Sequence, residues 1–285
     1  MECSEGTGLQ VAGVTTYTFG HGADQWDVWV FSPRDTMIGA HVTAGPLPVL
    51  YVTDPSATFL VTMSVAQTLL TLSHGTLAPF AIVGVGPRTD ELERLFSQRV
   101  RDLTPTANPS ADADPRYPSG GSRDFLDLLL NEVAPVVESR HDLDPSQRGV
   151  AGLSLGGLFC VTSLLERPEA FQRLLTVSPA VLWDDHVVLD RLQKLAPGAL
   201  AGTKAYVAVG EHESDGVLTW PGRAAFDEAG TGAQQPPDMV ADALLLGELL
   251  ERAGAEVVVD TIADEHHNTI WAAAVTRGII ELYGT

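Results

Sequence analysis

Basic residues are scarce in this sequence. It has 17 lysines and arginines against 37 aspartates and glutamates in 285 residues, which gives a formal net charge of −20. Proteins bind nucleic-acid phosphates and anionic membrane surfaces through basic patches. We therefore expect neither nucleic acid nor a membrane as a partner, and the acidic excess itself is typical of a soluble chain.

Cysteine is scarce as well. Cys3 and Cys160 are the only two, so the sequence implies no disulfide framework. Cys160 lies in an apolar run and is expected to be buried. The sequence has no histidine–cysteine cluster with zinc spacing and no glycine-rich phosphate loop with its lysine. We therefore expect a protein that needs neither a metal nor an organic cofactor.

Targeting and membrane-spanning segments are also missing. Residues 1–10 lack the positive and apolar regions of a secretory signal. No apolar run reaches the length of about 20 residues that spans a bilayer. These features predict a cytoplasmic protein whose partner is a small molecule, and they leave its oligomeric state open.

Short β-branched runs alternate with longer segments of helical periodicity along the chain. This alternation predicts a mostly parallel sheet with helices on both faces, in which binding sites gather at the carboxyl ends of the strands. We interpret residues 1–285 as one α/β domain with two polar, lid-like loops at 104–122 and 214–237. The expected strands, some with a following turn, cover 17–33, 47–56, 80–86, 148–157, 173–180, 204–211 and 256–264, and the expected helices cover 57–77, 123–142, 157–171, 238–255 and 268–284.

A serine between glycines is the most informative motif. The pentapeptide GLSLG, residues 152–156, matches the G-x-S-x-G nucleophile elbow, and it follows an expected strand and precedes an expected helix. In such a turn the glycines make room for a strained backbone that lifts the hydroxyl of Ser154 out of the sheet. The N–H of Leu155, at the positive end of the helix, is the first expected oxyanion donor. The alternative is a turn that serves only close packing.

A nucleophilic serine needs a histidine base and an acid that orients the histidine. In the α/β-hydrolase fold the acid and then the histidine follow the serine along the chain. His266 and His267 follow the last expected strand, and either can be the base. Glu211, Glu213 and Asp215 follow the strand before it, and any of them can be the acid. The residues alone leave both choices open.

Several segments carry a family resemblance. They are AGLSLGGLFCVTSLLERPEAFQRLLTVSPAVLW around the serine, RVRDLTPT at 99–106, VGEHE at 209–213 with the later DMVADALLLGELL, and EHHNTIWAAAVTRGI at 265–279. They resemble segments of the enterochelin esterase-like α/β-hydrolases, in particular the bacillibactin and salmochelin esterase branch, from about residue 48 to the end. The resemblance implies an α/β-hydrolase fold and esterase activity on siderophore trilactones.

The resemblance also assigns the catalytic residues. It makes Ser154 the nucleophile and Glu213 the acid, with Glu211 as the alternative. The pattern H-x-[ST]-[VI] of the siderophore esterase branch selects His267 as the base, whereas the enterochelin esterase pattern H-x-x-x-x-W selects His266. Because the other segments match the first branch, we prefer His267.

The chain departs from the family pattern at the second oxyanion donor. The family's first strand often ends in LLDG, where a nearby backbone N–H completes the hole, but this chain has YVTDPS and Pro55 has no N–H. We expect Ser56 to donate instead, with Ala57 as the alternative. The loop at 214–237 is longer than the resemblance leads us to expect, so the substrate pocket is expected to differ in shape.

Three further residues are candidates for substrate binding. Ferric catecholate siderophores are anionic, and Arg99 and Arg101, with Arg123 nearby in the sequence, offer a local basic patch. The alternative is that these arginines pair with carboxylates. Trp183 follows an expected strand, so it either lines an aromatic pocket or packs in the core.

Three functions are compatible with these sequence features. The first is a serine hydrolase that cleaves carboxylic esters through an acyl-enzyme on Ser154, with a siderophore trilactone as candidate substrate. The second is an acyltransferase or cyclase, in which an alcohol or amine replaces water. The third is a non-catalytic, ligand-binding relative that keeps only the fold.

Overall fold

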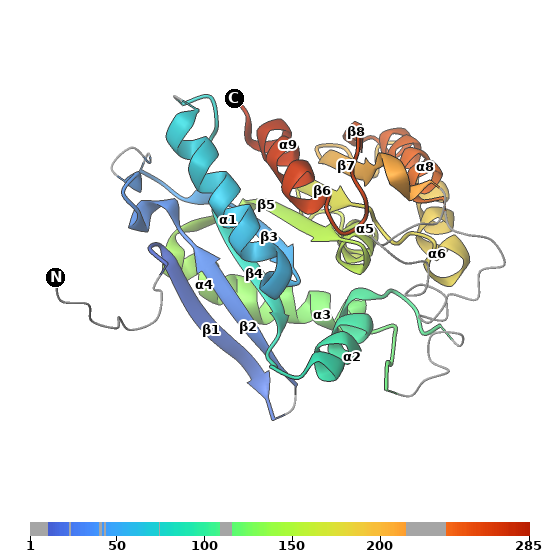
Figure 1. Ribbon diagram of the computed structural model, residues 1–285, viewed down its shortest axis with the longest axis horizontal. Helices are drawn as coiled ribbons and strands as arrows, with labels where there is room; N and C mark the ends of the chain where they lie inside the picture. Colours follow the sequence, from blue (N-terminus) through green and yellow to red (C-terminus); the bar gives the residue numbers. More distant parts are fainter. Residues whose placement is uncertain are drawn as a thin grey trace.

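A single mixed sheet forms the centre of the protein. The computed structural model describes residues 11–22, 24–39, 42, 44–73, 75–108, 116–214 and 238–285. Their strands make one eight-stranded sheet in the order β1-β2-β4-β3-β5-β6-β7-β8 (Figure 1). From β4 to β8 neighbouring strands are parallel, whereas β1 and β2 are antiparallel at one edge. The strands are β1 Val14–His21, β2 Asp24–Phe31, β3 Leu47–Thr53, β4 Ala81–Pro87, β5 Leu143–Leu153, β6 Arg173–Val177, β7 Lys204–Gly210 and β8 Glu256–Ile262.

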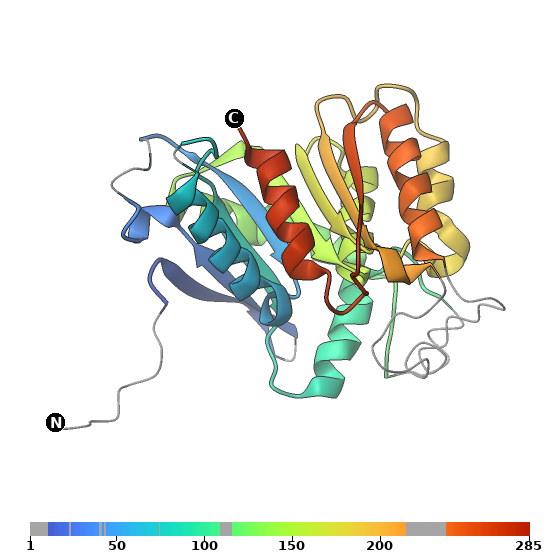
Figure 2. The same ribbon diagram turned by 45° about the horizontal axis from the view of Figure 1, so that its top comes forward.

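Helices cover both faces of this sheet, which confirms the predicted α/β-hydrolase fold. Helices α1 and α9 pack side by side on one face (Figures 1 and 2), and the other helices lie on the opposite face. Each face has its own apolar core, because the strands are buried on both sides. The helices are α1 Pro55–Leu72, α2 Leu92–Leu103, α3 Ser122–Leu128, α4 Ala134–His141, α5 Leu155–Glu166, α6 Trp183–Gln193, α8 Met239–Arg252 and α9 Trp271–Tyr283.

Two helices, α2 and α6, are absent from the sequence-based prediction. Helix α2 has apolar residues at helical spacing, at positions 92, 95, 96, 100 and 103, and the sequence-based prediction overlooked this pattern. Of these only Leu103 is buried, beside the polar side chains of Gln98 and Asp102. Helix α6 has non-helical backbone angles at residues 184–186, which interrupts its periodicity. The helix expected over 123–142 is divided as well, because a π-helical turn at Leu129–Val133 joins α3 to α4.

The two polar loops are described to different extents. Residues 104–108 and 116–121 have no helix or strand, as the composition of the loop at 104–122 predicts, and Ser122 already begins α3. Except for Ser214, the loop at 214–237 lies outside the described residues. Their action as lids stays a prediction.

Helix α1 is the one helix in the described part of the chain that is long and apolar enough to cross a membrane. In the fold, Phe59, Met63 and Ala66 of α1 are buried in the core between the sheet and α9. One face of α1 therefore packs in the core, whereas Leu60, Val61 and Leu72 are exposed.

Cys160 lies inside α5 and is fully buried, as predicted. Burial, with a smaller contribution from the charge of Asp54, raises the pKa of its thiol well above the usual range. A thiol that stays protonated is a poor nucleophile, so Cys160 is a packing residue. Cys3 lies outside the described residues.

Candidate active site

Ser154 occupies a sharp turn at the carboxyl end of β5. Strand β5 ends at Leu153 and α5 begins at Leu155, so Ser154 alone joins the two. Its backbone angles, φ 60° and ψ −117°, are unfavourable for a residue with a side chain. Ser154 N–H donates to Val177 O at 3.0 Å, and Ala180 N–H donates to Ser154 O at 3.0 Å. These bonds hold the strained strand-to-helix turn that GLSLG predicts.

The glycines of the motif are needed because the turn is crowded. A Cβ atom on Gly152 would collide with the backbone of Gly156. A Cβ atom on Gly156 would collide with the hydroxyl of Thr53, at the end of the neighbouring strand β3. A side chain at Gly152 would displace backbone, and one at Gly156 would displace the Thr53 side chain, so close approach of β3, β5 and α5 depends on both glycines.

A buried carboxylate–imidazole pair lies at the ends of β7 and β8. His267 Nδ1 is 2.7 Å from Glu213 Oε2. Glu213 is in the short 3₁₀ turn Glu211–Glu213 after β7, and His267 is in the loop between β8 and α9. Glu213 is completely buried and His267 is 8% exposed. A buried carboxylate that is hydrogen-bonded to an imidazole holds the ring in one orientation.

Two further donors hold the Glu213 carboxylate from its other side. Ser178 Oγ donates to Glu213 Oε1 at 2.6 Å, and Gly210 N–H donates to the same oxygen at 2.8 Å. Ser178 follows Val177, whose carbonyl accepts the Ser154 amide, so the end of β6 connects the serine turn to the acid. Sequence reasoning missed Ser178. Its signal is position, because it follows a strand next to the one that precedes Ser154.

The alternative residues have other contacts. Glu211 is exposed, and its Oε2 accepts the backbone N–H of Asp264 at 3.1 Å. The ring of His266 stacks on that of His212, with centroids 4.6 Å apart, and its Nδ1 has no hydrogen-bond partner in the described part of the chain. The structure thus brings Glu213 and His267 together and joins neither Glu211 nor His266 to this pair. Asp215 lies outside the described residues.

The backbone N–H groups predicted as oxyanion donors lie at the first turns of two helices. Leu155 is the first residue of α5 and Ser56 is the second residue of α1. Ala57 N–H already donates to Asp54 O at 2.9 Å, whereas the Ser56 amide has no acceptor among the described residues. Asp54 lies at the start of α1 with φ 54°, and its carboxylate lies beside Gly156. The start of α1 is therefore next to the serine turn.

The predicted arginine patch is made of ion pairs. Arg99 Nε lies 2.8 Å from Asp54 Oδ1, and both side chains are mostly buried. Arg101 contacts Asp24 at 2.8 Å and Asp102 at 2.7 Å. The hydrogen bond from Arg101 lowers the pKa of Asp24, whereas burial raises the pKa of Asp102 despite the same neighbour. Both arginines lie on α2. Only Arg99 pairs with Asp54, the residue beside the serine turn.

Trp183 and Arg123 take different positions. Trp183 is half-buried at the start of α6, and its Nε1 donates to the carbonyl of Thr106 at 3.3 Å. Thr106 in turn donates to Asp184 at 2.6 Å. Trp183 therefore packs against the described end of the 104–122 loop. Arg123 is exposed and lies 3.9 Å from Glu166, which is the carboxylate pairing named as its alternative.

A solvent-open pocket of about 430 Å³ adjoins the start of α1. It lies between the first turn of α1, strand β2 and the segment that leads from β4 into α2, so it shares Ser56 with the predicted oxyanion hole. Sequence reasoning did not identify this pocket, because its walls come from distant segments. Its lining residues are Asp27, Trp29, Asp54, Pro55, Ser56, Pro87, Thr89 and Leu95.

The fold and the serine turn define a class of protein. A mostly parallel sheet with helices on both faces, whose central strand ends in a strained G-x-S-x-G turn, is the architecture of an α/β-hydrolase. Residues 32–241 match the family model Esterase, described as "Putative esterase". The chain belongs to this esterase family, within the enterochelin esterase-like α/β-hydrolases, and it is an esterase.

Individual proteins agree with this assignment. The chain is 27% identical to the siderophore triacetylfusarinine C esterase of Aspergillus fumigatus over 82% of this chain and 81% of the relative. It is 31% identical to the ferri-bacillibactin esterase BesA of Bacillus subtilis over 50% of this chain and 51% of the relative. The crystal structure of the BES protein from Bacillus cereus superposes over 100% of both chains with a TM-score of 0.76 at 19% identity, which shows the shared fold.

Proposed function

We propose that this esterase hydrolyses the ester bonds of a siderophore trilactone, with Ser154 as nucleophile, His267 as base and Glu213 as the acid that orients the base. The observation that carries the proposal is the buried Glu213–His267 pair at the same sheet edge as the strained Ser154 turn. The substrate class rests on the names of two relatives, both siderophore esterases.

The hydrogen bond to Glu213 sets the chemistry of His267. With its proton on Nδ1, facing Glu213 Oε2, the imidazole leaves Nε2 unprotonated and able to accept a proton. Ser178 and Gly210 donate to the other carboxylate oxygen. These donors fix the carboxylate beside the imidazole, where it stabilises the imidazolium that forms during the reaction.

The reaction then follows acyl-enzyme chemistry. His267 Nε2 takes the proton from Ser154 Oγ while Oγ bonds to the ester carbonyl carbon, and the oxyanion that forms accepts the N–H groups of Leu155 and Ser56. The C–O bond to the alcohol breaks, and the alcohol oxygen takes the proton from His267. Water then attacks the acyl-enzyme by the same route, which frees Ser154 and a carboxylic acid. Each such N–H contributes roughly 3–4 kcal/mol to the transition state.

A ferric siderophore is anionic, so a cation beside the serine turn would favour its binding. Arg99 is the cation next to the serine turn, and its pairing with Asp54 uses Nε, so the other guanidinium nitrogens have no acceptor among the described residues. We assign Arg99 to substrate binding ahead of Arg101, whose charge two carboxylates already neutralise. A cytoplasmic location stays a prediction from the sequence.

Product analysis tests the proposal. Purified protein is incubated with triacetylfusarinine C and with bacillibactin, each iron-free and iron-loaded, and the products are identified by mass spectrometry. We expect stepwise addition of water to at least one trilactone, and an adduct at Ser154 after treatment with a fluorophosphonate. Ester products with an added alcohol, in place of acids, would instead support the acyltransferase. Absence of both turnover and adduct in folded protein would support the non-catalytic relative.

Ser178 is expected to act as a positioning residue. Ser178→Ala removes one donor to the buried Glu213 carboxylate, and a hydrogen bond to a charged group contributes about 1.5–3 kcal/mol. We expect kcat for ester hydrolysis to fall by about tenfold to a hundredfold with little change in KM. The matched control is Ser163→Ala, a buried serine that donates only to Phe159 O. An equal loss of kcat in both variants would show that the effect is loss of stability.

A further inference from the structure

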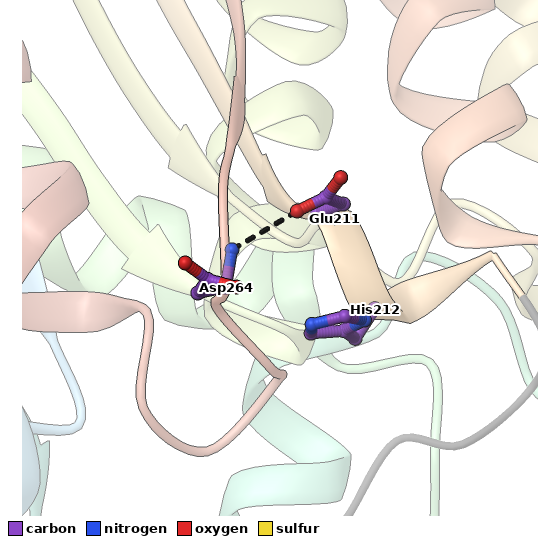
Figure 3. A group of neighbouring side chains, drawn as sticks. All are labelled: Glu211, His212 and Asp264. Atoms are coloured by element: carbon purple, nitrogen blue, oxygen red, sulfur yellow. Dashed lines mark hydrogen bonds between the residues drawn. The ribbon is translucent and has the colours of Figure 1, made fainter.

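Three side chains with metal-binding atoms meet on the surface beside the Glu213–His267 pair. Glu211 and His212 belong to the turn after β7, and Asp264 belongs to the loop after β8 (Figure 3). One ligand atom from each residue lies within 4.8 Å of the other two, and all three residues are exposed. Two carboxylates and one imidazole at this spacing form a mixed oxygen–nitrogen donor set that faces solvent.

The backbone already holds these groups together. Asp264 N–H donates to Glu211 Oε2 at 3.1 Å, the dashed line in Figure 3, and His212 N–H donates to Glu265 O at 3.2 Å. The two segments touch at Gly210, where an added Cβ atom would collide with the Glu265 carbonyl. The ligand atoms therefore need no rearrangement of the chain to meet, which lowers the entropic cost of binding an ion.

The imidazole of this cluster has no competing hydrogen bond. Among the described residues, the ring nitrogens of His212 and the carboxylate oxygens of Asp264 have no hydrogen-bond partner. By contrast, His141 is bonded to Tyr17 and His186 to Asp242. The His212 ring is held in place by stacking on His266, whose Nδ1 is buried without a partner. A packed ring with free nitrogens beside two carboxylates has the features of a ligand.

We propose that Glu211, His212 and Asp264 bind one divalent transition-metal ion of the zinc type. Imidazole in the donor set favours such an ion over magnesium or calcium, which prefer oxygen ligands alone. Three protein ligands leave the remaining position to water. The ion would connect the turn that carries Glu213 to the loop that carries His267, and so stabilise the native arrangement of both segments. This site does not depend on the proposed esterase substrate.

Zinc binding to tag-free protein tests the proposal. The protein carries Cys3→Ser, so that the thiol of Cys3 cannot contribute a ligand, and zinc chloride binding is measured by isothermal titration calorimetry. We expect one equivalent bound and a rise in Tm of a few degrees that a chelator reverses. His212→Ala and Asp264→Asn are each expected to weaken zinc binding about tenfold or more. Substituting a residue that only hydrogen-bonds to a metal ligand already lowers metal affinity by this amount.

The control is a partly buried histidine–aspartate pair between α6 and α8. His186→Ala removes an imidazole that contacts Asp242, and zinc affinity is expected to stay within about twofold of the parent. Equal zinc affinity in the parent and in His212→Ala would overturn the proposal, and so would the absence of binding. An equal rise in Tm with magnesium would also overturn it, because that result indicates a general effect of cations on an acidic surface.

Discussion

Ser154→Ala is expected to lower kcat for ester hydrolysis by about 10⁴- to 10⁶-fold and to abolish the fluorophosphonate adduct. The substitution removes the only atom that forms the acyl-enzyme. Residual activity would come from the oxyanion donors and from substrate binding, which remain. Steady-state kinetics on a chromogenic aryl ester, with intact-mass analysis after probe treatment, measures both effects.

The same variant is expected to fold normally. Ser154 Oγ makes no hydrogen bond to any described residue, and the backbone bonds of the turn do not involve the side chain. The variant therefore separates chemistry from stability, and its Tm should lie close to that of the parent. Ser64→Ala, on the exposed face of α1, is the matched control and should keep full activity. If Ser154→Ala keeps its kcat, Ser154 is not the nucleophile.

The second large effect is expected at His267. His267→Gln should lower kcat by about 10⁴- to 10⁶-fold, because glutamine can donate to Glu213 as the imidazole does but cannot accept the proton of Ser154 at neutral pH. The similar size and the retained hydrogen bond limit the loss of stability at this buried position. His266→Gln tests the alternative base, and its kcat should stay within about tenfold of the parent, since this ring contacts His212 and no carboxylate.

The double variant Ser154→Ala/His267→Gln gives a further check. The effects on kcat of substituting residues that act in one chemical step are not additive. The kcat of the double variant should therefore lie within about threefold of that of the slower single variant. A multiplied loss would show that the two side chains act independently. If His266→Gln is the slower of the two histidine variants, the base is His266 and the Glu213–His267 pair is structural.

Local sequence patterns determined the central part of this fold. β-branched runs buried on both faces predict parallel strands wherever they occur, and the glycines of GLSLG predict a crowded turn because only a hydrogen fits against β3 and α5. Cys160 is buried because the apolar residues around it follow the period of α5. The sequence signal for each of these features lies within one or two turns of chain, which is the range over which sequence periodicity is informative.

Position along the chain narrowed the site to a few residues without choosing among them. Two histidines and three acids follow the last strands, and adjacent residues in a loop have nearly the same sequence context. The choice depends on which side chain points into the protein, and that depends on contacts between β6, β7 and the loop after β8. Burial of Glu213 against Ser178 and His267 supports the proposal that Glu213 and His267 are the acid and the base. Because these contacts are long-range, Ser178 carries no local signal.

Helix α2 shows the same limit. Its buried face is largely polar, because Asp102 is satisfied by Arg101 and by the indole N–H of Trp26, which comes from β2. The spacing of its apolar residues indicates a helix, but it cannot show that Asp102 pairs with Trp26, 76 residues away in the chain. The sequence by itself therefore determined the parallel strands, the serine turn and the family, whereas residues 17–33, expected as one strand, contain most of β1 and all of the antiparallel β2. Only the tertiary structure decided the partners of each charged side chain, because burial and pairing are properties of residues that are distant in the chain.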